Sequence, residues 1–188
     1  MEGVSPVSRL LRLAGELLLT AGFILGLFLA WFAVVNDWVQ SASQQAAAED
    51  FARALQGSQS SGSVSNEVAD AEVVLPTEDS VGMPIVSPGE QGAAFALLYV
   101  PRFGDTYVRT IAEGIDLGLV LNDPQLGIGR YPSSAELGEP GNFSVAGHRT
   151  TYGAAFAKIG ELRTGDMLYV EVEEGWFAYS FRNLEYVW

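Results

Sequence analysis

An uncharged apolar run of 19 residues near the N-terminus constrains what this chain can fold into more than any other feature. Residues 17–35 read LLLTAGFILGLFLAWFAVV and contain no Asp, Glu, Lys or Arg. At about 1.5 Å per residue, an α-helix of this length would extend about 28 Å, close to the hydrocarbon thickness of a bilayer. The run therefore predicts a transmembrane helix at residues 17–35, preceded by a short segment at residues 1–16.

The charges around this run predict its orientation. Arg9 and Arg12 precede the run, and the next basic residue is Arg53. The positive-inside rule then places residues 1–16 in the cytoplasm and the rest of the chain outside the cell membrane. A cleaved signal peptide is the alternative, with the small residues 41–43 as its cleavage site, but the apolar region of a signal peptide is usually only about 7 to 15 residues long. We therefore expect a single-pass protein with an extracytoplasmic C-terminal domain.

Residues 36–94 have a different composition. They are rich in Ser, Gln, Ala and Gly and contain one Arg against nine Asp and Glu. Such a segment buries too little apolar area to offset the entropy lost on ordering, so it predicts a flexible acidic linker. Within it, the helix formers at residues 42–56 would allow the membrane helix to continue outward, and residues 57–93 are expected to be mobile.

From residue 95 to residue 188 the sequence consists of short β-type runs separated by Gly, Pro, Asn and Asp. Leu168, Val170 and Val172 alternate with polar residues, and a turn at residues 173–175 follows, which predicts a β-hairpin. The expected strands are residues 95–103, 107–113, 142–148, 166–173 and 176–186, and the expected helical connections are residues 116–121 and 155–162. We therefore predict an all-β domain, a barrel with short helices.

This domain is also expected to be incomplete. About 94 residues are few for an independent barrel, and the sequence stops on the apolar residues 186–188. An unpaired apolar edge strand is an aggregation hazard that complete domains avoid, which favours a fragment whose last strands are missing.

Composition excludes several kinds of chemistry. The sequence contains no cysteine and a single histidine, His148, which excludes disulfides, thiol chemistry and metal sites built from cysteine or several histidines. The net charge of −13 disfavours nucleic-acid binding, because a phosphate backbone requires a basic surface.

The most informative stretch is residues 138–153, which read GEPGNFSVAGHRTTYG. A Pro-Gly turn and a short apolar strand lead to His148, which is placed where the strand is expected to end. Histidine is the side chain that most readily exchanges protons near neutral pH, so His148 is a candidate general acid and base. On its own, a lone histidine is more often a structural or surface residue.

This stretch resembles the signature of sortases, above all those of class E. In that family a Gly-X-Gly-His-Tyr-Pro segment, a Gly-X-X-Gly-Asn turn and an Ala-Gly-His-Arg-Thr-Thr-Tyr-Gly segment follow one another at this spacing. Residues 127–132 carry the first segment with Arg130 in place of histidine, and residues 138–142 and 146–153 match the other two in full. With its flanking strands, the resemblance covers nearly all of residues 97–188.

The resemblance implies an eight-stranded β-barrel and a membrane-anchored cysteine transpeptidase of the Gram-positive cell surface. Such an enzyme cuts a C-terminal sorting signal of the LPxTG or LAxTG type and joins the surface protein to an amine of a peptidoglycan precursor or a pilin. A cysteine thiolate attacks the scissile carbonyl, a histidine transfers protons, and an arginine steadies the oxyanion. His148 occupies the position of that histidine, whereas Arg149 belongs to the histidine segment and is expected to be a structural or rim residue.

The family's cysteine and arginine lie on later strands and have no counterpart in this sequence. The sequence therefore predicts a C-terminally truncated sortase that is inactive alone. A noncatalytic sortase-like module that binds a sorting signal or wall component is the alternative, and a membrane anchor joined to an unrelated β domain is a third reading.

Further residues are assigned by position in or near the motif. Tyr152 and Thr151 are predicted to line the substrate groove, although a loop-anchoring tyrosine is the alternative for Tyr152. No cofactor and no metal are expected. Calcium is the one alternative, at Glu171, Glu173 and Glu174, but a solvated hairpin is favoured because calcium ligands normally converge from several segments.

Overall fold

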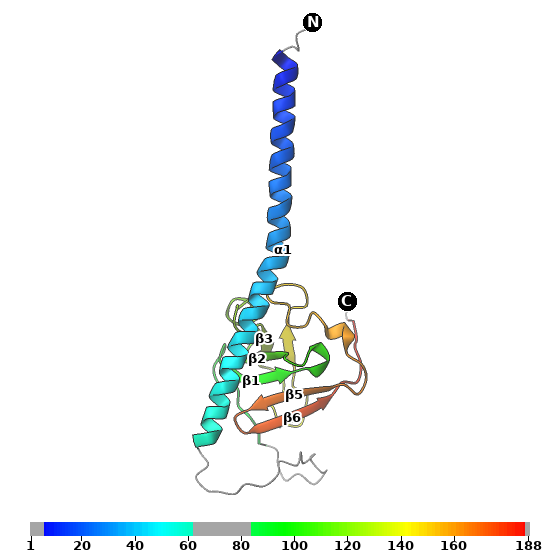
Figure 1. The fold of residues 1–188 in the computed structure, drawn as a ribbon. Helices are drawn as coiled ribbons and strands as arrows, with labels where there is room; N and C mark the ends of the chain where they lie inside the picture. The colour runs from blue at the N-terminus through cyan, green and yellow to red at the C-terminus, as the bar shows by residue number, and fades with distance from the viewer. Residues whose placement is uncertain (1–5, 62–83, 187–188) are drawn as a thin grey trace.

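The computed structural model describes residues 6–61 and 84–186 (Figure 1). A single long helix, α1 (Pro6–Ser61), extends well beyond a compact domain and runs alongside it with its C-terminal part. The domain contains six strands, which are β1 (Ala94–Tyr99), β2 (Val108–Glu113), β3 (Ile128–Arg130), β4 (Val145–Gly147), β5 (Met167–Val172) and β6 (Gly175–Ser180).

The six strands form one sheet in the order β4-β3-β2-β1-β5-β6. Neighbouring strands are antiparallel except β2 and β3, which are parallel. The predicted β architecture with short helices is confirmed for this domain. Within residues 84–186 the sheet is open, with β4 and β6 at its edges.

The hairpin is the best predicted element. Val172 pairs with Gly175, so Glu173 and Glu174 form a two-residue turn between β5 and β6. Other bounds differ from the prediction. The strand predicted at 142–148 is paired only over β4, the strand predicted at 176–186 ends at Ser180, and β3 was not predicted as a strand.

The helical connection predicted at residues 116–121 is confirmed, and the one predicted at residues 155–162 is shorter than expected. Leu117–Leu121 forms a helical turn, whose start is capped by Asp116 Oδ1 accepting from the backbone N–H groups of Gly118 and Leu119, each at 2.8 Å. Residues 155–162 contain only the turn Ile159–Glu161, and Pro101–Phe103 forms a further turn inside the strand predicted at 95–103.

One face of the sheet carries the main hydrophobic core. Apolar side chains from β1, β2, β3, β5 and β6 pack there with residues of the connecting loops. In β1, Ala96 and Leu98 point to this core, whereas Leu97 points to the opposite face, as the two-residue period of a strand requires. Leu97 is nevertheless fully buried, so both faces of β1 are covered.

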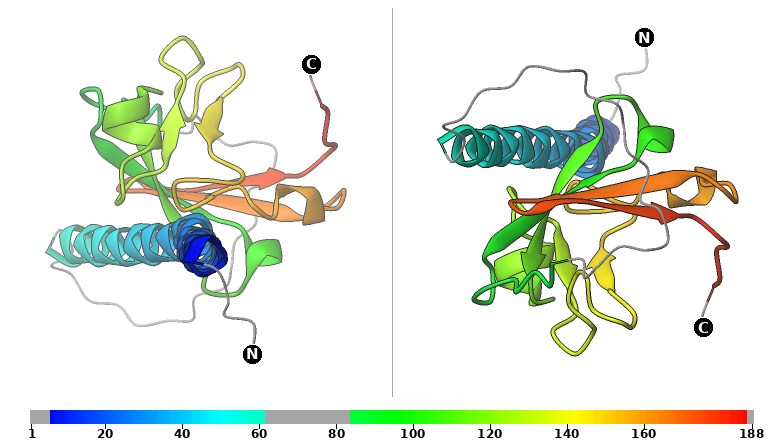
Figure 2. Two further views of the ribbon diagram at one scale, coloured as in Figure 1. Left: turned by 90° about the horizontal axis from the view of Figure 1, so that it is seen from above. Right: turned by 90° about the horizontal axis from the view of Figure 1, so that it is seen from below.

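Helix α1 covers the second face. Ala48 and Leu55 of α1 pack against Leu97 and Val108, with Phe51 at their side. Residues 48, 51 and 55 recur at the spacing that places side chains on one face of a helix. Figure 2 shows the helix lying along the β1–β2 side of the sheet.

Polar contacts also hold α1 on the sheet. The buried guanidinium of Arg109 donates from its two terminal nitrogens to Gln45 Oε1 at 2.5 Å and to Ser41 Oγ at 2.8 Å, and it lies 4.8 Å from the ring centroid of Tyr107. Gln45 Nε2 donates to the carbonyl of Thr106 at 2.6 Å. Burial lowers the pKa of Arg109 and raises the pKa of Tyr107 to about 12.

The structure therefore differs from the predicted linker at 36–94. Residues 36–61 belong to α1, and apolar positions in their second half are buried against the sheet. Residues 84–94 join the domain as well, because Val86 is buried and its N–H donates to the carbonyl of Leu137 at 3.0 Å. The rest of the predicted linker, residues 62–83, lies outside the described residues, as does most of the segment predicted to be mobile.

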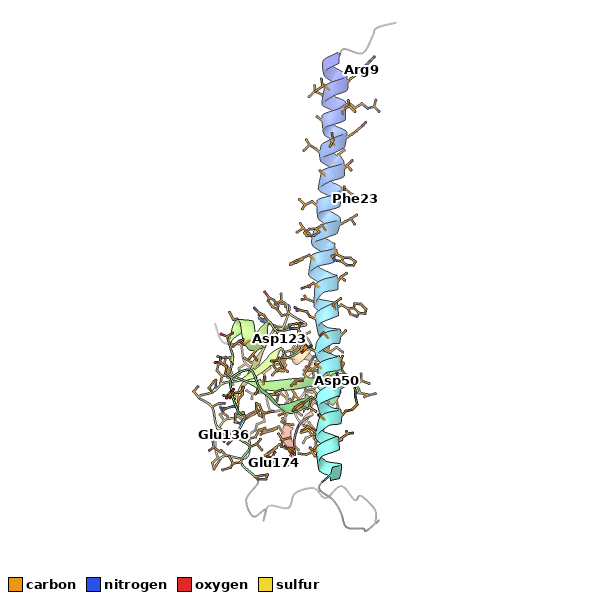
Figure 3. All side chains as sticks on the ribbon, turned by 90° about the vertical axis from the view of Figure 1, so that its left-hand side faces the viewer. Arg9, Phe23, Asp50, Asp123, Glu136 and Glu174 are labelled. Carbon is orange, nitrogen blue, oxygen red and sulfur yellow. The ribbon has the colours of Figure 1, made fainter. Side chains whose placement is uncertain are left out.

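The N-terminal half of α1 projects away from the domain (Figure 1). Its large apolar side chains project outward, as at Phe23, which is 69% exposed (Figure 3). Within the part of the chain that the structure describes, α1 is the one helix long and apolar enough to cross a membrane.

Candidate functional site

His148 lies at the end of β4, where the chain leaves the sheet. The backbone of β4 is fixed by pairing with β3, in which Gly147 faces Ile128. The ring of Phe156 packs directly on Gly147, where an added Cβ would come within 2.8 Å of that ring. The carbonyl of His148 accepts from the N–H of Phe156 at 2.9 Å. These contacts hold the histidine at a defined place with its side chain half-buried.

The imidazole is oriented by an amide from a distant loop. His148 Nε2 lies 2.8 Å from Oδ1 of Asn122, and a proton on Nε2 would donate to that oxygen. Asn122 follows the helical turn that Asp116 caps, and its own N–H donates to the carbonyl of Leu117 at 2.8 Å. In the neutral tautomer with its proton on Nε2, Nδ1 carries the lone pair and can accept a proton.

Tyr152 packs beside the histidine. The centroids of the two rings lie 4.9 Å apart, with 38° between their planes. Tyr152 has a backbone φ of 51°, a conformation that residues other than glycine rarely adopt. Thr151 is exposed, and its carbonyl accepts from the N–H of Ala154 at 2.9 Å. In the structure, the ring of Tyr152 therefore contacts the ring of His148. Thr151 lies in the same loop and forms a turn there.

The two arginines near the motif have different surroundings. Arg149 is exposed at the rim of the loop. Arg130, which stands where the family has histidine, is buried and forms a bidentate ion pair with Glu113 of β2, with Nε–Oε2 at 2.7 Å and a terminal nitrogen–Oε1 at 2.9 Å. It also donates to the carbonyl of Ser134 at 2.7 Å. The guanidinium therefore crosslinks β2, β3 and the loop that follows.

An apolar cavity of about 440 Å³ lies on the core face of the sheet. Val145, Ala146 and Gly147 of β4 line it, and Tyr179 and Phe181 line it from the direction of β6. The strand that forms this wall leads directly to His148. His148 itself does not line the cavity, but it directly follows Gly147, which does.

The acidic residues of the hairpin do not form a shared site in the structure. Glu171 is buried and accepts from the hydroxyl of Tyr99 at 2.6 Å, while Glu173 and Glu174 occupy the turn. Residues 6–61 and 84–186 contain no group of three or more His, Cys, Asp or Glu side chains that could hold a metal ion. The calcium alternative stays a prediction.

Sequence reasoning missed two residues that shape this site. Asn122 lies 26 positions from His148, and Gln44 lies on α1, where its Nε2 donates to the carbonyl of Tyr152 at 3.0 Å. Single amides carry no local pattern. The helical spacing of Gln44, Ala48, Phe51 and Leu55 was the available signal, because it predicts one buried face on this helix.

The fold and the site define a mostly β protein with a histidine at a strand end, in contact with an asparagine and a tyrosine. The sequence of residues 98–188 matches the family model described as the sortase domain. Sortase SrtE1 of Streptomyces coelicolor is 36% identical over 105 residues, covering 52% of this chain and 29% of that relative. Sortase SrtE2 of the same organism is 28% identical over 169 residues, covering 88% and 59%.

Residues 98–188 thus belong to the sortase family, whose members are cysteine transpeptidases, and both relatives carry class E names, as the motif predicts. The chain spans less than two thirds of the length of either curated relative. The solved structure of sortase E from Streptomyces avermitilis is 38% identical and has a TM-score of 0.47, covering 52% of this chain and 62% of that chain.

Proposed function

We propose that this chain is the membrane-anchored part of a class E-like sortase and supplies the histidine of its active site. The observation that carries this proposal is the geometry of His148. It lies at the end of a paired strand, with Nε2 on Asn122 and its ring against Tyr152, inside the segment that matches the sortase family.

The proposed reaction transfers an acyl group in two steps. A thiolate attacks the scissile carbonyl of a sorting signal, and the C–N bond breaks as the leaving amine takes a proton from the imidazolium of His148. An acceptor amine then attacks the thioester and passes its proton to the neutral imidazole while the thiolate leaves. These 188 residues contain no cysteine, so the thiolate must come from elsewhere.

The apolar cavity supports a site in which His148 and the thiol come from different parts of the enzyme. It opens on the core face between the two edge strands β4 and β6, and its lining is mostly apolar. Apolar surface of this kind is unfavourable in water. We propose that the part of the enzyme carrying the thiol packs on this face, which would bring it beside His148.

The proposed substrates are surface proteins with a C-terminal sorting signal of the LPxTG or LAxTG type. The proposed acceptors are amines of a peptidoglycan precursor or a pilin. These assignments rest on the family alone, and Tyr152 and Thr151 are the residues proposed to contact the signal.

We also propose that α1 anchors the protein in the membrane, with the N-terminus in the cytoplasm. Its large apolar side chains between Leu17 and Phe32 are 56–76% exposed, which favours lipid over water as their surroundings. The same helix continues without a break to the domain, and Gln44 lies nine residues beyond Val35, which is about 14 Å along an α-helix. The histidine loop, which Gln44 contacts, would then lie at the membrane-proximal end of the domain.

This topology can be tested with protease added to intact protoplasts. A C-terminal tag should be digested and an N-terminal tag should be spared, because Arg9 and Arg12 hold the N-terminus inside. A lysed sample, in which both tags are digested, is the control. Digestion of the N-terminal tag alone in intact protoplasts would overturn the orientation.

The absence of cysteine favours a second candidate, a noncatalytic module that binds a sorting signal without cutting it. The two candidates differ in what happens when a thiol is supplied. The chain extended with the C-terminal part of Sortase SrtE1 should join a sorting peptide to an amine if the catalytic proposal is right. A noncatalytic module would bind the peptide in that form and leave it intact.

A further inference from the structure

We propose that Gln44, on the part of α1 that emerges from the proposed membrane span, is a positioning residue for His148. Its amide ties together the two loops that orient the imidazole. The meaning of this role for catalysis rests on the proposed function, but the role itself concerns only the geometry of the site.

The first observation is the burial of Gln44. Its side chain is 0% exposed although the residue is polar and lies on a long helix. It fills a cradle made by Gly127 and Gly153, where an added Cβ on either glycine would lie closer than 3.0 Å to the amide of Gln44. Its Nε2 donates two hydrogen bonds, whereas its Oε1 is buried without a hydrogen-bond partner among the described residues.

The second observation is the identity of its hydrogen-bond partners. Gln44 Nε2 donates to the carbonyl of Tyr152 at 3.0 Å and, at a longer 3.4 Å, to the carbonyl of Asp123. Tyr152 packs its ring on His148, and Asp123 directly follows Asn122, which contacts His148 Nε2. One amide thus bridges the loop whose tyrosine packs on the imidazole and the loop whose asparagine contacts its Nε2.

The third observation is the conformation of the histidine loop. Tyr152 and Ala154 have φ values of 51° and 45°, in the left-handed region that disfavours residues with a Cβ. A loop of this kind keeps its conformation only when contacts from outside enforce it. The bond from Gln44 to the carbonyl of Tyr152 is such a contact, and the close fit at Gly153 is another.

These contacts couple the helix to the histidine. Gln45 and Ser41 contact Arg109 and are two of several residues that hold α1 on the sheet, together with the apolar contacts of Ala48 and Leu55. Gln44 links the helix held in this way to the loops of the site. A shift of α1 along its axis would therefore move the carbonyl contacts of Tyr152 and change the packing of its ring on His148.

The test uses the full chain in detergent micelles, with its histidine and tyrosine rings isotopically labelled. Because the chain has one histidine, His148 gives a single ring Hε1 signal. Gln44→Met keeps nearly the same volume but removes the donor. We expect it to weaken the nuclear Overhauser effect between the His148 and Tyr152 rings at least about twofold and to shift Hε1, because the ring of Tyr152 turns away.

Gln45→Met is the matched control. It removes hydrogen bonds from the neighbouring residue of the same helix but touches neither loop, so the ring contact should persist. An unchanged ring contact in Gln44→Met would overturn the proposal. So would equal changes in both variants, since docking of the helix as a whole would then explain them.

A measurement on the unsubstituted chain keeps the proposal testable if Gln44→Met fails to fold. The side-chain amide protons of Gln44 should show Overhauser effects to the Hα protons of Gly153, and their absence would contradict the assignment. None of these readouts requires turnover. If the chain had no catalytic function, the Overhauser effects described above would still be observed. If these effects were absent, the positioning role of Gln44 would be wrong, and the catalytic role of His148 would still be tested separately by activity.

Discussion

Replacing Arg130 with methionine should lower the free energy of unfolding by about 3–5 kcal/mol, because it leaves the carboxylate of Glu113 buried without its partner. Arg130 and Glu113 are only 4% and 7% exposed, and their side chains meet through two parallel hydrogen bonds. A carboxylate in such surroundings loses both its counter-charge and its donors. The loss can be measured as the shift in the urea midpoint of the near-ultraviolet circular dichroism of the full chain in detergent.

The control for this prediction is Arg102→Met. Arg102 forms a similar two-bond pair with Asp166, at 2.8 Å and 2.6 Å, but its side chain is 38% exposed. Water screens such a pair, so we expect a much smaller loss than for Arg130→Met. Replacing Glu113 with leucine together with Arg130→Met should recover most of the stability, because no buried charge remains. An Arg130→Met loss no larger than that of Arg102→Met would contradict the structural role given to the buried pair.

The second large effect concerns the missing thiol. The 188 residues alone should form no thioester and join no sorting peptide to an amine above background, because they contain no cysteine. A serine or threonine hydroxyl ionises far less readily than a thiol and would need a stronger base. In a serine protease, removing the nucleophile lowers the rate about 10⁶-fold. We expect a difference of this order between the chain that carries a thiol and the 188 residues alone.

Mass spectrometry of the reaction products would check this expectation. The control is the chain extended with the C-terminal part of Sortase SrtE1, which should react, alongside the same extension with its nucleophilic cysteine replaced by alanine, which should not. Joined product from the unextended 188 residues would contradict the chemistry proposed for the site.

The elements that the sequence predicted well are those with a local signal. The β5–β6 hairpin has two alternating apolar faces and a two-residue turn, and each of these features acts over fewer than ten residues. Strand β3 lacks such a signal. It has three residues, one of them Gly129, and is held by parallel pairing with β2 and by the distant strand β4.

The helical part of the predicted linker also depends on contacts that are distant in the sequence. Its helix formers indicated a helix, but its polar composition favoured a free segment. What buries Ala48 and Leu55 is the face of β1 and β2 near Leu97 and Val108, between about 40 and 60 positions later in the sequence. The continuous apolar run of β1 is typical of a strand buried on both faces and was the indirect sign that something covers it.

Only part of the candidate site was predicted, because some of its residues come from distant segments of the chain. His148 was found because its motif is contiguous, and the contact with Tyr152 lies within that motif. Asn122 and Gln44 come from segments that only the folded chain brings to the histidine. Arg130 departs from the family motif, and its role became clear only from the buried position of Glu113.

The most direct test of the account measures the extended chain with His148 replaced by alanine. We expect kcat/KM for joining a sorting peptide to an amine to fall by about 10²–10⁴-fold, the usual contribution of a positioned general acid and base. Arg149→Ala, which alters the exposed neighbouring residue, should leave the rate nearly unchanged. An extended chain that turns over equally fast with and without His148 would contradict the assignment of this histidine as the proton-transfer residue.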